Sequence, residues 1–561
     1  MTTTESPTTA ADAAEELPWH LRENRAPVTD ELTVTDLEVI GSIPPELSGR
    51  YVRNGANPQT GWSEHWFLGD GMVHGIELDG GRANWYRNRY VRTPMHANPG
   101  VERMDLYLDP ETFAFNYDVS TANTHVIGHN GRIFALEEGS FPYELDRQLD
   151  TVGACDFDGR LVTAMTAHPK ICPETGELLF FGYSSVPPYL VYHRVDASGR
   201  LVQSEEITVG GPTMMHDFVV SRNHSIFMDL PAVFDMELAM SGRMPIRWSD
   251  EYPARFGVMP RDGSDGDVRW FDVDPCYVFH TLNAFDVAAS DSESGHDEVV
   301  VHGCRINELW RDSAEIGDPD SADPADAPYM WEWRFDLDTG SVSERQIDDR
   351  ASEFPRVPDT EVGLRNRFGY TMSMSTDGLT GEIFKYDLAD GGSRTAHQFP
   401  DGQTSGEPVF VPADGATSAD DGYLMSFVHD ITTDRSHLTI LDASDMAADP
   451  VAQVMLPRRV PAGFHGSWIA DCSAPRFTGP LAAQLGTLPD HVGDRREAAD
   501  QDAQRPRVGE HQRGRRAQVV GRHPHPGHGP DGQAAGVGNR RGGGPERARL
   551  PGRRQRAVQS R

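Results

Sequence analysis

Short apolar segments separated by turn signals recur along most of this chain, and this pattern restricts it to an all-β fold. Segments such as 131–136 (GRIFAL), 178–183 (LLFFGY) and 225–230 (SIFMDL) are rich in β-branched and aromatic residues, which favour strands. Turn sequences such as PETGE at Pro173 and DLDTG at Asp336 separate these segments at short intervals. Repeated hairpins of this kind are typical of β-propeller blades, and a pair of β-sandwiches is the structural alternative.

Composition divides the chain into three parts. Residues 1–30 are rich in Thr, Ala and Glu and predict a flexible N-terminal arm. Residues 31–470 carry the strand pattern, and about 440 residues at about 60 per blade predict a seven-bladed propeller. Residues 471–561 are dominated by Arg, Gly, Pro and Gln, which predicts a low-complexity, disordered tail. The abrupt change of composition after Ala470 suggests a reading-frame change in the source gene.

The chain is strongly acidic, with 86 Asp and Glu against 51 Lys and Arg, a net charge of −35. Only two lysines occur, Lys170 and Lys385. Such a surface repels phosphates, which argues against a nucleic acid partner, and it favours an acidic proteome in a salt-rich cytoplasm. The N-terminus lacks the features of a signal peptide, and the five cysteines are widely spaced. We therefore expect a cytoplasmic protein without disulfides.

Four of the 22 histidines share one setting, because each stands at or beside the end of an apolar, strand-like segment. They are His168 in TAHPK, His216 in MMHDF, His280 in FHTLNAFD and His465 in GFHGSW. Their separations of 48, 64 and 185 residues correspond to about one, one and three blades. Strands of different blades converge only on the propeller axis, so the spacing predicts that these imidazoles surround one metal ion. The competing interpretation is four ordinary core or surface histidines.

Iron suits this donor set better than zinc. Four protein ligands would close a tetrahedral zinc site, whereas six-coordinate iron keeps positions open for O₂. Each ligating imidazole also needs its other N–H fixed by a carboxylate or a carbonyl. Glu138, Glu353 and Glu407 are candidates, since each lies in an apolar or Pro-flanked segment. Surface glutamates are the alternative interpretation.

A series of motifs makes the chain similar to the carotenoid cleavage oxygenase family. In order they are GRYVRNGANPQ, HWFLGDGMVHG, ALEEGSFPYELD, TAHPK, MMHDF, FHTLNAFD, SEFPR, GEPVFVP and RVPAGFHGSW, and they cover residues of about 35 to 470. The resemblance implies a seven-bladed propeller with the metal on its axis and loops or short helices that form a cap over one face.

The resemblance also implies one Fe(II) ion per chain and cleavage of an alkene by O₂ into two carbonyl products. The residues that match the ligand motifs are His168, His216, His280 and His465, and those that match the supporting carboxylates are Glu138, Glu353 and Glu407. The sequence does not indicate which glutamate supports which histidine.

The implied substrate is an apolar polyene, either a carotenoid or an apocarotenoid, with a stilbene as the alternative. Stilbene-cleaving relatives carry a Lys immediately before the first of these glutamates, where this chain has Glu137. A carboxylate cannot stabilise a phenolate, so the sequence favours carotenoids or apocarotenoids. Trp66, Phe67, Phe141 and Trp468 lie near the motifs and are candidates for lining a substrate tunnel, with core packing as the alternative.

Residues 230–240 (LPAVFDMELAM) form a markedly apolar segment. Interior packing of a short helix is the favoured interpretation, and an apolar rim that touches a membrane is the alternative. The residues concerned are Leu230, Val233, Phe234, Met236, Leu238 and Met240. Two other functions remain open: a non-catalytic propeller that binds an apolar ligand, and an isomerising relative with the same metal site. The sequence gives no indication of the oligomeric state.

Overall fold

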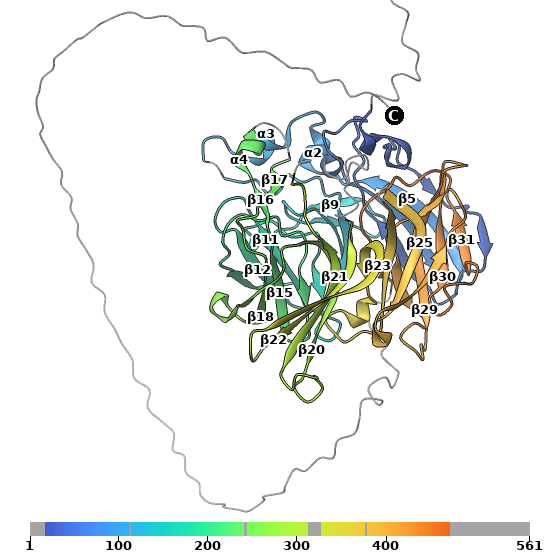
Figure 1. The fold of residues 1–561 in the computed structure, drawn as a ribbon. Helices are drawn as coiled ribbons and strands as arrows, with labels where there is room; N and C mark the ends of the chain where they lie inside the picture. Colours follow the sequence, from blue (N-terminus) through green and yellow to red (C-terminus); the bar gives the residue numbers. More distant parts are fainter. Residues whose placement is uncertain (1–16, 113, 241–243, 312–326, 376–377, 472–561) are drawn as a thin grey trace, which may run out of the picture. The chain divides into compact units, whose positions relative to one another are not determined.

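The computed structural model describes residues 17–471, apart from 113, 241–243, 312–326 and 376–377. The predicted tail beyond Asp471 and the first half of the predicted arm therefore lie outside the described residues. Strands predominate in the part that is described (Figure 1). By their pairing these strands form seven antiparallel blades and one additional two-stranded ribbon.

The first blade combines strands from both ends of the described chain, in the order β1-β5-β4-β3-β32. Its strands are β1 (Thr33–Val34), β3 (Gly49–Arg53), β4 (Met72–Asp79), β5 (Arg82–Tyr90) and β32 (Gly466–Ala470).

The second, third and fourth blades have four strands each. The second contains β6 (His125–His129), β7 (Arg132–Leu136), β8 (Tyr143–Leu145) and β9 (Thr151–Ala154). The third contains β10 (Lys170–Ile171), β11 (Leu178–Tyr183), β12 (Leu190–Val195) and β13 (Leu201–Glu206). The fourth contains β14 (Val219–Val220), β15 (His224–Asp229), β18 (Arg255–Pro260) and β19 (Arg269–Asp272). The ribbon is formed by β16 (Ala232–Phe234) and β17 (Ile246–Trp248).

The fifth and sixth blades share the long strand β23 (Val342–Arg356) and so form one continuous seven-stranded sheet. Up to Ala351 this strand pairs with β22, and from Ser352 onward it pairs with β24. The fifth blade also contains β20 (Tyr277–Val287), β21 (Glu298–Ile306) and β22 (Tyr329–Asp336). The sixth also contains β24 (Phe368–Ser375), β25 (Gly378–Asp387) and β26 (Ser393–Gln398).

The seventh blade again combines both ends of the chain, because the N-terminal strand β2 pairs with β31. Its strands are β2 (Val39–Gly41), β27 (Gln403–Ser405), β28 (Val409–Pro412), β29 (Gly422–Asp430), β30 (Arg435–Asp442) and β31 (Ala452–Met455). Pairing of β3 with β32 and of β2 with β31 closes the ring twice. The predicted seven-bladed propeller is confirmed.

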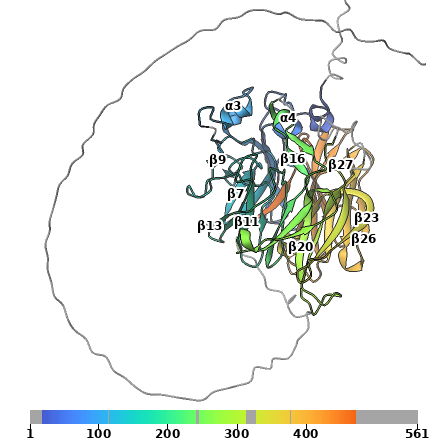
Figure 2. The ribbon, with the colours of Figure 1, turned by 60° about the vertical axis from the view of Figure 1, so that its left-hand side comes forward.

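Short helices lie together on one side of the strands, as Figures 1 and 2 show. They are α2 (Pro94–Ala97), α3 (Arg103–Tyr107) and α4 (Met236–Met240). The predicted cap over one face is therefore present. No helix within the described ranges is long and apolar enough to cross a bilayer.

Part of the N-terminal segment before residue 31 is packed against the rest of the fold. Two 3₁₀ turns, η1 (Trp19–Leu21) and η2 (Glu23–Arg25), precede the first strand, and all three residues of η1 are buried. The indole of Trp19 meets that of Trp66 edge-on, and the Arg25 guanidinium stacks on both rings. Residues 19–25 are therefore packed against the rest of the fold, and the proposed domain limits at residues 31 and 470 remain predictions.

Helix α4 also differs from the favoured interpretation. Leu230 is buried, but Met236 is 57% exposed and Met240 is 82% exposed. Interior packing is therefore wrong for these two methionines. Met236 and Met240 are four residues apart and therefore share one face of the helix, and this face is open to solvent.

Several histidines are buried as neutral groups, and His193 on β12 is the clearest case. Its ring is fully buried, stacks on Phe180 and has both nitrogens within 2.8 Å of hydroxyls, those of Thr163 and Ser204. Burial lowers the pKa of His193 to about 3. An unfolded histidine titrates near about 6.5. Between these values only the unfolded chain takes up the proton, so the free energy of unfolding falls as the pH decreases.

Between pH 6.5 and pH 4 the free energy of unfolding should therefore fall by a few kcal/mol less in His193→Gln than in wild type. Each pKa unit corresponds to about 1.4 kcal/mol. The measurement is urea unfolding across this pH range. His296→Gln is the control, because His296 is partly exposed and Asp336 raises its pKa. Removing His296 should not reduce the dependence of the free energy of unfolding on pH in this range. An equal pH dependence for wild type and His193→Gln would contradict the expectation.

Candidate metal centre

Each of the seven blades contributes one of the seven residues predicted for the site. From the first blade to the seventh they are His465, Glu138, His168, His216, His280, Glu353 and Glu407. The histidines stand immediately before or within β10, β14, β20 and β32, each of which lies at one end of the strand order of its sheet. A propeller brings such strands together, so residues that are far apart in the sequence meet at its centre.

The four histidines are buried, and each offers a nitrogen within 4.8 Å of those of the other three. The Nε2 atoms of His168 and His216 are 2.9 Å apart, and those of His216 and His280 are 3.3 Å apart. Two nitrogens bound at about 2.1 Å to one ion would be separated by about 3.0 Å at a right angle and about 3.4 Å at a tetrahedral angle. The observed distances fit a shared metal ion without identifying it.

Three carboxylates, of which that of Glu138 is half-buried and the other two are buried, bind the second nitrogen of three imidazoles. The Nδ1 atom of His216 donates to Glu138 at 2.7 Å, and that of His280 donates to Glu353 at 2.6 Å. The third pair is His465 and Glu407, at 2.9 Å. The structure thus resolves the pairing that the sequence left open. No carboxylate bonds to His168 within the part of the chain that is described.

These hydrogen bonds determine where the imidazoles carry their protons. Because Nδ1 of His216 and of His280 faces a carboxylate, Nδ1 carries the hydrogen and Nε2 presents a lone pair. Two lone pairs that face each other at 3.3 Å repel unless a proton or a metal ion lies between them. The donor set therefore fits a metal ion, and it fits ordinary core histidines poorly.

The local electrostatics lower the pKa of two of the four histidines and raise that of a third. Burial lowers the pKa of His168 well below its ordinary value, and the adjacent imidazoles lower it further. Burial also lowers the pKa of His465 strongly, against the opposing charge of Glu407. At His280 burial again lowers the pKa, but the charge and hydrogen bond of Glu353 outweigh it and the net pKa is raised. Neutral imidazoles are the form that binds a metal.

Aromatic side chains that the sequence reasoning missed surround the imidazoles. Phe354 stacks on His280 at 5.2 Å and contacts His465 at the same distance, while Phe279 meets His216 edge-on at 5.3 Å. Phe354 has a φ of 54°, a left-handed conformation that a bulky residue adopts only under constraint. Only the SEFPR motif signalled this position.

Two of the four predicted tunnel residues contact the residue that precedes the last histidine. Trp66 and Phe67 contact the ring of Phe464 at 4.7 and 5.6 Å, directly before His465 in the chain. Phe141 packs on the core cluster of the second and third blades. Trp468 packs on the core cluster of the first and seventh blades. A role in substrate binding remains a prediction for all four.

Glu137, beside Glu138, is buried and paired. Its carboxylate accepts hydrogen bonds from Arg103 at 3.0 Å and from the backbone N–H of Gly139 at 2.7 Å. Arg103 belongs to helix α3, and the hydroxyl of Tyr107 in the same helix donates to the carbonyl of Gly139. The cap helix is therefore attached directly to the loop that carries Glu138.

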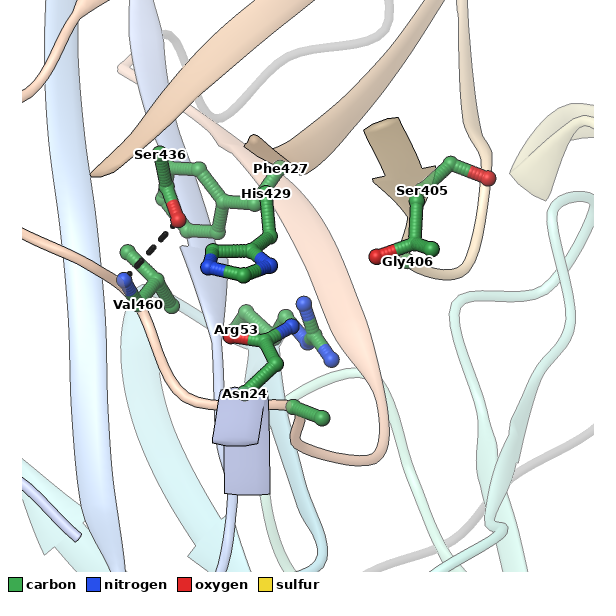
Figure 3. Close-up of a pocket in the computed structure, with 10 residues that line it drawn as sticks. Asn24, Arg53, Ser405, Gly406, Phe427, His429, Ser436 and Val460 are labelled. Carbon is green, nitrogen blue, oxygen red and sulfur yellow. Dashed lines mark hydrogen bonds between the residues drawn. The ribbon is translucent and has the colours of Figure 1, made fainter. Parts of the chain in front are cut away.

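A small cavity of about 10 Å³ is lined in part by the residues that precede Glu407 in the chain (Figure 3). Arg53, Ser405, Gly406 and His429 are among the residues that line it. A volume of this size holds about one water molecule. The cavity is therefore a packing feature of this loop and is too small for an organic substrate.

Comparison with known proteins identifies relatives over nearly the whole described chain. The family model described as "Retinal pigment epithelial membrane protein" (RPE65) matches residues 25–470. The chain is 38% identical over 513 residues to a carotenoid cleavage oxygenase of Mycobacterium tuberculosis, covering 82% of this chain and 99% of the relative. It is 35% identical over 504 residues to carotenoid 9,10(9',10')-cleavage dioxygenase 1 of Arabidopsis thaliana, covering 81% and 90%.

Solved structures give the same result for the fold. A lignostilbene dioxygenase from Pseudomonas brassicacearum superposes with a TM-score of 0.70 at 29% identity, covering 80% of this chain and 98% of the other. Cobalt-substituted ACO from Synechocystis superposes with a TM-score of 0.69 at 26% identity, covering 79% and 97%.

If Glu353 fixes His280 for metal binding, Glu353→Gln should weaken metal affinity about 10- to 100-fold, the usual effect of losing such a partner. Titration with cobalt(II), followed by its visible absorption, measures this. Glu332→Gln is a matched control, since Glu332 forms a buried pair with His302 at 3.0 Å, away from the four histidines. Equal affinities for the two variants would contradict a specific role of Glu353.

Proposed function

This chain belongs to the RPE65 family, which includes carotenoid cleavage oxygenases, and we propose that it is an iron(II) dioxygenase of carotenoids or apocarotenoids. It splits one C=C bond of the polyene with O₂ and yields two carbonyl products. The observation that carries this proposal is the convergence of four buried imidazoles on one point. The family relatives named as cleavage oxygenases supply the reaction class.

We propose that His168, His216, His280 and His465 hold one Fe(II) ion per chain. Four neutral ligands leave the full charge of the ion available at the remaining positions. Iron, when bound, supplies the electron-transfer chemistry that activates O₂. The donor set and the relatives support iron, and the nitrogen distances alone fit zinc or cobalt equally well.

The protein's own residues orient the ligands and keep water away. Glu138, Glu353 and Glu407 fix three imidazoles in the tautomer that directs Nε2 inward. Phe279 and Phe354 cover faces and edges of the rings, which makes the surroundings of the imidazoles apolar. The reaction requires no general acid or base, so positioning the double bond and excluding water are the main tasks of the chain.

The buried pair of Glu137 with Arg103 favours a carotenoid or apocarotenoid over a hydroxystilbene. Stilbene-cleaving relatives have a Lys at the position of Glu137, where a cation can stabilise a phenolate. In this chain the position carries a carboxylate, which forms an ion pair with Arg103. The similarity to a lignostilbene dioxygenase structure keeps a stilbene as the second candidate.

Cleavage under ¹⁸O₂ in unlabelled water tests the reaction directly. Purified, iron-loaded protein is incubated with a panel of carotenoids, apocarotenoids and hydroxystilbenes, and the aldehydes are reduced at once and identified by mass. We expect two products from one apocarotenoid or carotenoid, each with one ¹⁸O atom. Protein stripped by a chelator is the control.

The other outcomes identify the alternatives. An isomerised product of unchanged mass would support an isomerising relative, and tight binding without products would support a non-catalytic binder. Cleavage of stilbenes alone would overturn the substrate class while leaving the reaction in place.

We further propose that the cap face contacts a membrane through exposed apolar side chains. Met104 of α3 is 55% exposed, Met236 of α4 is 57% exposed and Met240 is 82% exposed. Both helices lie on the same side of the propeller (Figure 2). A carotenoid dissolves in lipid, and an apolar rim of this kind could draw it from a bilayer.

The double variant Met236→Ser/Met240→Ser should reduce binding to phosphatidylcholine vesicles several-fold in a flotation assay, because it removes apolar surface from the rim. Ile431→Ser is the control, since Ile431 is 63% exposed in the turn after β29. Vesicle binding that is equal for both variants would contradict a rim at α4.

A further inference from the structure

The segments that carry the four histidines are tied together by side chains outside the histidine–glutamate set. These contacts use backbone groups and neighbouring side chains of the histidines rather than the imidazoles. Three such linking residues stand out, Asp217, Arg356 and His125, and they belong to the fourth, sixth and second blades.

Asp217 follows His216 and is 1% exposed. One carboxylate oxygen accepts from both the backbone N–H and the hydroxyl of Thr281, at 2.8 and 2.7 Å, and Thr281 follows His280. The other oxygen pairs with Lys170, two residues after His168, at 2.8 Å. One buried carboxylate therefore joins the third, fourth and fifth blades at three of the histidines.

Arg356 makes the corresponding connection on the opposite side of the ring. Its Nη1 atom donates to Glu407 at 3.2 Å and to the carbonyl of Gly466 at 3.0 Å. Burial raises the pKa of Glu407, but the charge of Arg356 and the hydrogen bond from His465 outweigh it and hold the pKa well below its ordinary value. Arg356 thus joins the sixth and seventh blades to the strand that begins after His465.

His125 on β6 joins the two remaining segments. Its Nδ1 atom donates to the carbonyl of Ala167 at 2.9 Å, directly before His168. Its Nε2 atom lies 3.3 Å from the hydroxyl of Ser467, two residues after His465. With Nδ1 protonated toward a carbonyl, Nε2 accepts from that hydroxyl. His125 is 8% exposed, and its ring lies 5.3 Å from that of His465 without joining the group of four.

Together these links close a circle. His125 connects the first, second and third blades, Asp217 connects the third, fourth and fifth, and Arg356 connects the sixth, seventh and first. The hydrogen bond between His280 and Glu353 spans the remaining step, from the fifth blade to the sixth.

We propose that Asp217 and His125 are positioning residues that set the spacing of the four ligand segments from outside the histidine–glutamate set. This inference rests on the proposed function, since it assumes that the four histidines bind a metal. A metal site tolerates only small displacements of its ligands, so supports at the backbone matter as much as those at the imidazoles. Glu138, Glu353 and Glu407 orient the rings, whereas Asp217 and His125 fix where the backbone holds them.

Asp217→Asn tests the first residue, because it keeps the shape and removes the charge that pairs with Lys170. We expect cobalt(II) affinity about 10- to 100-fold weaker than in wild type and a changed visible absorption of the bound ion. Asp229→Asn is the matched control: Asp229 is fully buried, pairs with Arg255 at 2.9 Å and belongs to the same blade. The control should lose stability while its cobalt affinity and spectrum stay as in wild type.

Thr281→Val provides a milder variant, should Asp217→Asn fail to fold. It removes one of the two donors that Thr281 offers to Asp217 and keeps the backbone N–H. A shifted cobalt spectrum in this folded variant supports the proposal. Wild-type affinity and spectrum in whichever of the two variants folds would overturn it.

His125 is tested with two substitutions of different chemistry. His125→Phe fills the space without a donor and should alter the cobalt spectrum, whereas His125→Asn keeps an N–H for the carbonyl of Ala167 and should restore it. Identical spectra for both would remove His125 from the proposal. Wild-type protein that binds no metal would instead refute the proposed function, so the two failures are distinguishable.

Discussion

The structure depends on bringing four imidazole nitrogens within 4.8 Å of one another in a buried place. Lone pairs so close repel, and neutral imidazoles would normally rotate to bond with each other or with water. The carboxylates of Glu138, Glu353 and Glu407 prevent this by fixing the opposite nitrogen of three rings. A metal ion placed between the nitrogens would remove this repulsion. The arrangement, which is unfavourable without an ion, therefore favours the binding of a cation.

Closure of the propeller makes this arrangement possible. Strand β32 begins directly after His465 and completes the first blade by pairing with β3, so the last histidine reaches the centre only when the ring closes. Because every blade contributes one residue, the site exists only in the complete ring. The cap helix α3 is attached through Arg103 and Tyr107 to the loop of Glu138, so it is linked to a segment that supports the site.

Most of the fold could be predicted from the sequence, as could the four histidines that the structure brings together, since strand patterns, turn signals and motif order are local properties. The pairing within the site could not. Glu138 lies in the second blade but holds His216 in the fourth, 78 residues away, and no local pattern encodes such a contact. His125 and Phe354 were missed because a linking hydrogen bond and a left-handed backbone are visible only after folding. Trp19 was placed in a flexible arm because its burial depends on Trp66 and Arg25, two tertiary partners.

X-ray absorption at the iron edge of the purified, iron-loaded protein tests the central claim most directly. The account predicts one iron per chain, bound by four imidazole nitrogens with no sulfur ligand, and loss of one imidazole from the spectrum in a His465→Ala variant. Iron bound by fewer imidazoles, or a spectrum that is unchanged in this variant, would contradict it.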